Sequence, residues 1–155
     1  AYANSMGKSL IELLDDIYLE FGYFQEINKN KVFEGAQGAQ LIQKLADSYS
    51  INPPSICDFS KATKVINFSK DIIHDSEGDL IPKEKMIFIH LEDGRKFAIR
   101  PSGTEPKIKF YLFGHSLPEK ITTNNLNDIK EQTNNGLLSL WEWIQNDIEK
   151  RLEQS

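Results

Sequence analysis

Apolar residues recur every three or four positions in three stretches of the chain, which predicts three helices. In the first, residues 9–21, apolar and acidic side chains take opposite faces. Ser9 followed by Glu12 gives the order of a capping box, and Gly22 is typical of a helix end. The third stretch, residues 127–152, keeps its apolar spacing throughout and predicts a long C-terminal helix.

The second helical stretch follows two glycines. Gly35 and Gly38 precede apolar residues at helical spacing, and the pair Pro53-Pro54 ends this unit. Two glycines ahead of a helix can expose backbone amides to an anion. Close packing between two segments is the more common reason for such a pair, so close packing is what we expect here.

Alternation of apolar and polar residues predicts strands in the middle of the chain. Four such strands are predicted, at residues 63–68, 86–91, 97–99 and 108–113. Asp93-Gly94, between the second and the third, is a strong hairpin signal. We also expect a connection over residues 23–30, a short strand at 31–33, and Ile72-Ile73 as an extension of the first strand after a kink. Residues 74–79 are predicted to form an exposed polar loop, because they lack the ordered spacing of a calcium-binding loop.

This order of elements indicates the α+β class: an antiparallel sheet of about four to five strands with helices packed on one face. The length of 155 residues, with 39% hydrophobic and 26% charged residues, suits an ordinary globular domain. A net charge of −5 argues against a general nucleic-acid binder. The sequence has no apolar run typical of a membrane span or a signal peptide. The single cysteine, Cys57, excludes an intrachain disulfide, fits a reducing cytoplasm, and is expected to be buried.

The most sharply specified polar segment is Arg100-Pro101-Ser102-Gly103-Thr104-Glu105-Pro106, between two predicted strands. Arg100 offers a planar guanidinium that matches phosphate oxygens, while Ser102 and Thr104 add hydroxyl groups. Gly103 lets the backbone turn so that consecutive amides point at one anion. The ten residues from the start of this segment contain three cations and one anion. The same residue types also make an ordinary tight turn with solvated charges, so the residues alone leave both interpretations open.

The segment, continued by Lys107-Ile108-Lys109 and preceded by Asp93-Gly94, resembles the phosphate-binding loop of the α-D-phosphohexomutases. In that family the loop lies in the C-terminal domain of a four-domain enzyme. Residues 7–22 resemble the last helix of domain three, and Phe33-Glu34-Gly35 with its helix resembles the start of domain four, as in phosphoglucomutases and phosphomannomutases. The resemblance covers the chain from residue 7 to residue 113, and the C-terminal helix is longer than the family leads us to expect.

The resemblance implies that the full-length protein moves a phosphoryl group between the 1-position and the 6-position of a sugar phosphate, or the 5-position of a pentose. A phosphoserine, Mg²⁺ and a sugar 1,6-bisphosphate intermediate take part. The phosphate that does not react is expected to contact Arg100, Ser102, Gly103 and Thr104. The expected partners are the sugar phosphate and domains one to three, with no nucleic acid and no membrane, in the cytoplasm. This part of the protein is expected to bind phosphate but no metal, and to supply no catalytic residue.

The sequence has no segment resembling the serine loop, the metal loop or the sugar-selecting loop of the family, which belong to the first three domains. We therefore expect a C-terminal fragment, cut from a longer chain, that does not catalyse alone. Residues 1–24 are assigned to the end of domain three, and residues 25–155 to a TBP-like phosphoglucomutase C-terminal domain. Lys107-Ile108-Lys109 differs from the Leu-Ile-Arg of phosphoglucosamine mutases, which favours the glucose, mannose or pentose branches. A phosphopentomutase, a phosphoglucosamine mutase and a non-catalytic phosphate-binding module remain the alternatives.

Overall fold

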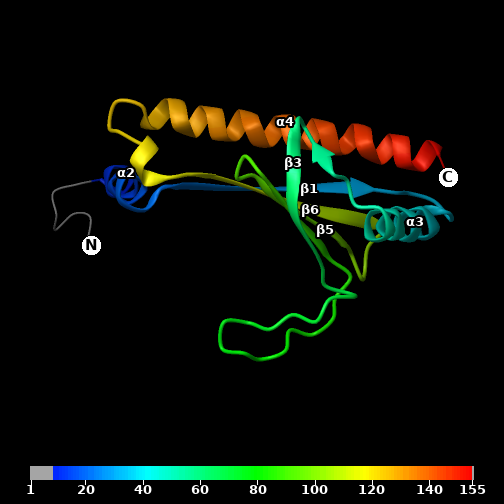
Figure 1. The fold of residues 1–155 in the computed structure, drawn as a ribbon. Coiled ribbons are helices and arrows are strands. Elements are labelled where there is room, and N and C mark those ends of the chain that lie inside the picture. The colour runs from blue at the N-terminus through cyan, green and yellow to red at the C-terminus, as the bar shows by residue number, and fades with distance from the viewer. Residues whose placement is uncertain (1–8, 155) are drawn as a thin grey trace.

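A computed structural model describes residues 9–154 of the chain. They form a six-stranded antiparallel sheet in the order β1-β6-β5-β4-β3-β2, with the helices α3 and α4 packed on one face (Figure 1). The elements in chain order are α2 (Leu10–Phe21), β1 (Tyr23–Val32), α3 (Gly38–Ile51), β2 (Ile56–Cys57), β3 (Ser60–Asn67), β4 (Ile87–Leu91), β5 (Lys96–Pro101), β6 (Lys107–Ser116), the 3-10 helix η1 (Pro118–Lys120) and α4 (Leu126–Glu153). The predicted α+β class is confirmed, but the sheet has six strands and not four to five.

The first strand accounts for part of this difference. Residues 23–30 were predicted to be a connection, yet Tyr23–Val32 form one strand that pairs with β6 along its whole length. Its helix-facing positions include Gln25, Lys29 and Lys31, so apolar and polar residues do not alternate along it. An edge strand tolerates such polar residues, because one of its sides is open to solvent.

The opposite edge and the exit from β3 also differ from the prediction. The two-residue strand β2 forms a hairpin with β3 through Asp58 and Phe59, whose φ angles are positive, 47° and 63°. Ile72-Ile73 does not extend β3, because the chain turns after Asn67, whose backbone N–H donates to the Asp71 carboxylate at 2.7 Å. Between β3 and β4, residues 68–86 form a long excursion that we call the arm.

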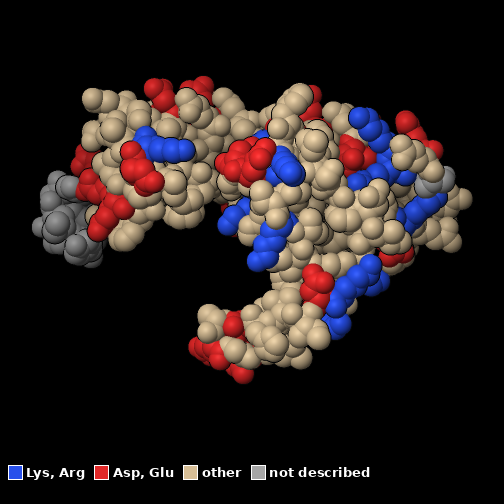
Figure 2. Space-filling model, in the orientation of Figure 1, with Lys and Arg blue, Asp and Glu red and all other residues tan. Residues whose placement is uncertain are grey.

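The arm is the lower green loop in Figure 1 and projects as a separate lobe in Figure 2. Residues 74–79 at its tip are polar and mostly exposed, as predicted. Acidic side chains gather at this tip, whereas basic side chains lie nearer the base of the arm (Figure 2). Nζ of Lys83 donates to the carbonyl of Lys70 at 3.3 Å, which joins the two sides of the arm. The last residues of the arm lead directly into β4.

The core lies between the sheet and the two long helices. It consists of apolar side chains from the helix-facing positions of β4, β5 and β6 together with one face each of α3 and α4. Its fully buried members include Leu45, Tyr49, Ile89, Phe97, Ile99, Ile108, Phe110, Leu112, Leu137, Leu140, Ile144 and Ile148. Cys57 is buried at the edge of this core, as predicted.

Two predictions about helix ends are confirmed, and a third is confirmed for one glycine of two. Ser9 and Glu12 form the complete capping box of α2, and Gly22 follows α2 with a φ of 98°. Gly38 is needed for close packing, because a Cβ there would overlap the carbonyl oxygen of Phe33. Gly35 is not, since a Cβ there would meet no atom within 4 Å; its φ of 92° is the reason for a glycine instead. Residues 7 and 8, which carried part of the resemblance at this helix, lie outside the described residues.

Candidate functional site

The segment from Arg100 to Pro106 joins β5 to β6 at one end of the sheet. Arg100 and Pro101 still belong to β5, and β6 begins at Lys107. The backbone N–H of Ser102 donates to the carbonyl of Lys107 at 2.9 Å, which closes the base of the loop. The N–H of Phe33, just after β1, donates to the carbonyl of Pro106 at 2.8 Å. The loop is therefore fixed to the ends of three neighbouring strands.

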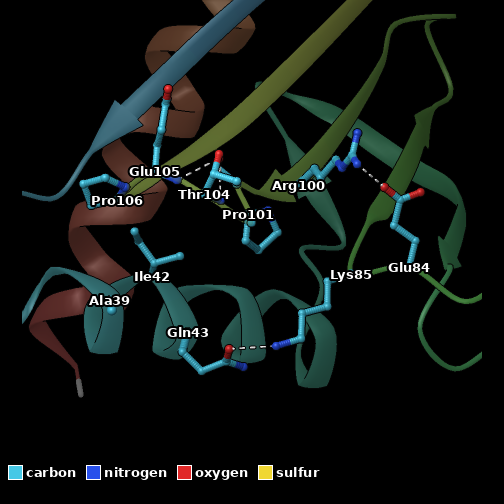
Figure 3. A pocket seen from close by; sticks show the side chains of 12 residues that line it. Ala39, Ile42, Gln43, Glu84, Lys85, Arg100, Pro101, Thr104, Glu105 and Pro106 are labelled. Carbon is cyan, nitrogen blue, oxygen red and sulfur yellow. Dashed lines mark hydrogen bonds and ion pairs between the residues drawn. The ribbon is translucent and has the colours of Figure 1, made fainter.

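A cavity of about 570 Å³ lies beside this loop, and all four residues predicted to contact phosphate line it. The loop forms one wall, the first turns of α3 form the floor, and the base of the arm forms a third side (Figure 3). The predicted contacts are Arg100, Ser102, Gly103 and Thr104, and the other lining residues are Ala39, Ile42, Gln43, Glu84, Lys85, Pro101, Glu105 and Pro106. The fold thus brings the predicted residues together with a helix and an arm that come from distant parts of the chain.

The Arg100 guanidinium points toward the base of the arm (Figure 3). One of its terminal nitrogens, Nη2, lies 2.6 Å from Oε1 of Glu84. Both side chains are half-exposed, at 48% and 41%, so solvent weakens this ion pair. On the neighbouring strand, Lys109 pairs directly with Arg100 in the sheet register. Two cations opposite each other repel, which makes this end of the sheet favourable for an anion.

The turn itself presents backbone amides held by weak contacts. The Ser102 hydroxyl oxygen accepts from the N–H of Glu105 at 3.3 Å and from that of Thr104 at 3.5 Å. These distances are long for hydrogen bonds, so an anion oxygen can replace the hydroxyl at small cost. Gly103 does not have the positive φ of a glycine-dependent turn, and a Cβ there would meet no atom within 4 Å. The turn therefore does not require Gly103, contrary to our prediction; its missing side chain leaves room beside the backbone.

The local charges are more balanced than the sequence count of three cations and one anion suggested. Lys107 pairs with Glu105 at 2.5 Å. The hydrogen bond from Lys107, together with its positive charge, lowers the pKa of the Glu105 carboxyl, and Lys109 adds to the same effect. Two of the three cations therefore already have a carboxylate partner.

Lys85 is a cavity residue that the sequence analysis did not identify. Its Nζ donates to the neutral side-chain oxygen of Gln43 at 3.0 Å, across the cavity floor (Figure 3). Lys85 lies on the arm, far from the loop in sequence, so no local motif connects the two. An ammonium group that meets a neutral amide oxygen keeps its charge available for an anion.

Outside this cavity the titratable groups look structural. Burial raises the pKa of the Cys57 thiol to about 12, with a further contribution from Asp147, so the thiol is protonated at neutral pH. His115 stacks on Phe24 with ring centres 4.1 Å apart. Within residues 9–154, no group of three or more histidine, cysteine or carboxylate side chains is placed to hold a metal ion. No helix in that range is long and apolar enough to cross a membrane.

Comparisons with known proteins agree with the sequence resemblance. Residues 58–122, which include the whole loop, match the family model described as phosphoglucomutase/phosphomannomutase, C-terminal domain. The chain is 36% identical over 113 residues to a phosphoglucomutase of Staphylococcus haemolyticus, covering 68% of this chain and 20% of that protein. It is 30% identical over 140 residues to a phosphoglucomutase of Staphylococcus saprophyticus, covering 84% of this chain and 24% of that protein. The chain carries a C-terminal domain of the phosphoglucomutase/phosphomannomutase family, and it spans about a fifth to a quarter of the length of these relatives.

Two solved structures are similar in part. A protein of unknown function from Staphylococcus aureus aligns with a TM-score of 0.49 and 9% identity over 86% of this chain and 96% of its own. The open form of the phosphoglucomutase pp63/parafusin from Paramecium aligns with a TM-score of 0.39 and 14% identity, covering 92% of this chain and 23% of its own.

Proposed function

We propose that this domain binds the non-reacting phosphate of a sugar phosphate in a phosphoglucomutase-type enzyme. The observation that carries the proposal is the placement of Arg100, Ser102, Gly103 and Thr104 around one cavity, on a loop fixed to three strand ends. The family of the domain and the names of its relatives support the same function.

The role of each group follows from its chemistry. The Arg100 guanidinium supplies two parallel donors to a phosphate, and the amides of Thr104 and Glu105 point at the same side as the Ser102 hydroxyl that they now contact. Lys85 adds a second positive charge from the base of the arm. Each charge-assisted hydrogen bond contributes about 1.5–3 kcal/mol before the costs of binding. Holding one phosphate fixes the position of the other end of the sugar, where the bond is made.

In the full-length protein we propose interconversion of glucose 1-phosphate and glucose 6-phosphate, in the cytoplasm. Phosphoserine chemistry and the handling of Mg²⁺ and of a sugar 1,6-bisphosphate belong, in this proposal, to domains one to three. In the part of the chain that the structure describes, no group of three or more histidine, cysteine or carboxylate side chains is placed to hold a metal ion. The domain alone is therefore proposed to bind phosphate without turning over substrate. The division into residues 1–24 and 25–155 stays a prediction.

The relatives named phosphoglucomutase favour glucose over mannose, pentose or glucosamine as the sugar. A non-catalytic module that uses the same loop is the second candidate. The coding sequence upstream of residue 1 separates the two: a serine loop and an aspartate-rich metal loop there support an enzyme, and a frame that lacks both supports a binding module.

Phosphate binding is tested by NMR titration of the 155-residue chain with inorganic phosphate and with glucose 6-phosphate. We expect the amides of residues 102–105 to shift first, and Arg100→Ala to weaken binding by tenfold or more, about 1.4 kcal/mol. Lys96→Ala is the matched control, because it removes a cation from the opposite end of the same strand. Equal affinity in Arg100→Ala and in the unmodified chain would refute the site.

A further inference from the structure

The geometry points to Glu84 as a built-in competitor for phosphate: it holds the Arg100 guanidinium while the loop is empty and must release it when phosphate binds. This inference rests on the proposed phosphate site, and it adds a residue that lowers the affinity of that site. Glu84 lies on the arm, outside the loop, and no motif in the sequence connects it with Arg100.

The first step is the direction of the Arg100 side chain. Its guanidinium lies 2.6 Å from the Glu84 carboxylate and points away from Thr104, across Pro101 (Figure 3). Both side chains line the same cavity. A guanidinium that faces the arm cannot at the same time present its paired donors to an anion held by the loop amides, so binding requires Arg100 to turn.

The second step is that the backbone of Glu84 is held in place beside Arg100. Its backbone N–H donates to the carbonyl of Phe68 at 3.1 Å, which ties together the two ends of the arm. Its own carbonyl accepts from the N–H of Met86 at 2.9 Å, immediately before β4. The backbone of Glu84 is thus fixed just before β4, which keeps its carboxylate within reach of Arg100.

The third step compares the two anions. Glu84 offers one negative charge to a half-exposed guanidinium, whereas a phosphate group at neutral pH carries between one and two and accepts hydrogen bonds from the loop amides as well. Phosphate therefore displaces the carboxylate, and its binding free energy is reduced by the strength of the ion pair that it breaks. For exposed pairs of this kind the loss corresponds to a change in affinity of about two- to fivefold, or about 0.4–1 kcal/mol.

This competition would also make the site selective among anions. Without Glu84, Arg100 and Lys109, its neighbour across the strands, would attract small anions in general, because an anion reduces the repulsion between the two cations. Glu84 neutralises Arg100 until a ligand arrives that contacts the loop amides too. We therefore expect Glu84 to reduce binding of small monovalent anions more than binding of a sugar phosphate.

The test is a double-mutant cycle on the 155-residue chain, titrated with inorganic phosphate at constant ionic strength and followed by amide NMR shifts. Glu84→Gln is expected to lower the Kd for phosphate by about two- to fivefold. Combined with Arg100→Ala, it is expected to have no such effect, because the competitor then has nothing to hold. Glu84→Asp keeps the charge but shortens the side chain, and we expect it to fall between the unmodified chain and Glu84→Gln.

Glu77→Gln is the matched control, since it removes the same charge from the tip of the same arm. An equal gain from Glu77→Gln, or an equal gain from Glu84→Gln in the Arg100→Ala background, would show a general charge effect and overturn the inference. Phosphate binding with no change in Glu84→Gln overturns the inference and leaves the proposed function standing. Absence of binding in both the unmodified chain and Glu84→Gln overturns both.

Discussion

The contact between α3 and α4 contains one buried hydroxyl, and removing this hydroxyl tests how much the contact contributes to the free energy of unfolding. Tyr49 of α3 is fully buried, and its hydroxyl donates to the Asp147 carboxylate of α4 at 2.6 Å. Arg151 lies over the Tyr49 ring with its guanidinium carbon 4.0 Å from the ring centre, and it donates to the same carboxylate at 2.7 Å. Burial, followed by the charge of Asp147, raises the pKa of the Tyr49 phenol, so the hydroxyl stays a donor over the accessible pH range.

Tyr49→Phe removes a hydrogen bond to a charged group and leaves the carboxylate paired with Arg151. The expected loss is about 1.5 kcal/mol in the free energy of unfolding, or about 3–6 °C in Tm for a domain of this size. Asp147→Ala is expected to cost about 3 kcal/mol, because it leaves both the hydroxyl and a largely buried guanidinium without their carboxylate. Arg151 keeps acceptors at the Ser48 hydroxyl and the Asn52 carbonyl, both at 2.9 Å, which limits the loss.

Urea unfolding followed by circular dichroism measures both variants. Tyr111→Phe is the matched control: its half-buried hydroxyl makes no hydrogen bond to the described residues, and we expect a change within about 0.5 kcal/mol. A Tyr49→Phe variant as stable as this control would refute the assigned role of the hydroxyl. So would an Asp147→Ala variant no less stable than Tyr49→Phe, since the buried arginine would then need no partner.

Two further predictions concern the loop and the hairpin before it. Gly103→Ala is expected to change the free energy of unfolding by no more than about 0.5 kcal/mol, because a Cβ meets open space there. The same variant is expected to weaken phosphate binding. A loss of stability in urea unfolding, or unchanged phosphate affinity in the NMR titration, would contradict this. Burial raises the pKa of the Asp93 carboxyl, but hydrogen bonds and the charge from Arg95 outweigh it, so the folded pKa lies below the usual value. The resulting stabilisation is present above the unfolded pKa of about 3.9 and is lost as the pH falls through the lowered folded pKa. In urea titrations between about pH 5 and 2, the free energy of unfolding of Asp93→Asn should therefore depend less on pH than that of the unmodified chain.

Much of the architecture was predictable because its signals are local. The capping box of α2, the spacing of apolar residues in α4 and the Asp93-Gly94 turn each act within a few residues, and all three appear as expected. Only the end of β1, at residues 31–32, was recognised as a strand. The rest was missed because an edge strand does not need alternating apolar residues. β2 has only two residues, too few for any periodicity.

The site shows the same division between local and distant information. The loop residues stand together in sequence, so their convergence on one cavity was predictable. Glu84 and Lys85 reach that cavity only because the arm returns to the sheet beside the end of β5, and nothing near them in sequence indicates that partner. Gly103 illustrates the opposite error, since a glycine in a turn suggested a backbone requirement that the backbone does not have.

β1 pairs with β6 along its whole length, so the two strands would move together as one rigid unit. β1 starts directly after Gly22 and ends beside the loop, where Phe33 binds the Pro106 carbonyl. Its ten residues span about 33 Å at the usual rise of a strand. A rotation of about 10° at Gly22 would therefore carry the loop through about 6 Å, with the hydrogen-bonded ladder moving as a stiff rod. Small changes of angle where the chain enters the sheet would thus become large changes in the position of the loop from Arg100 to Pro106.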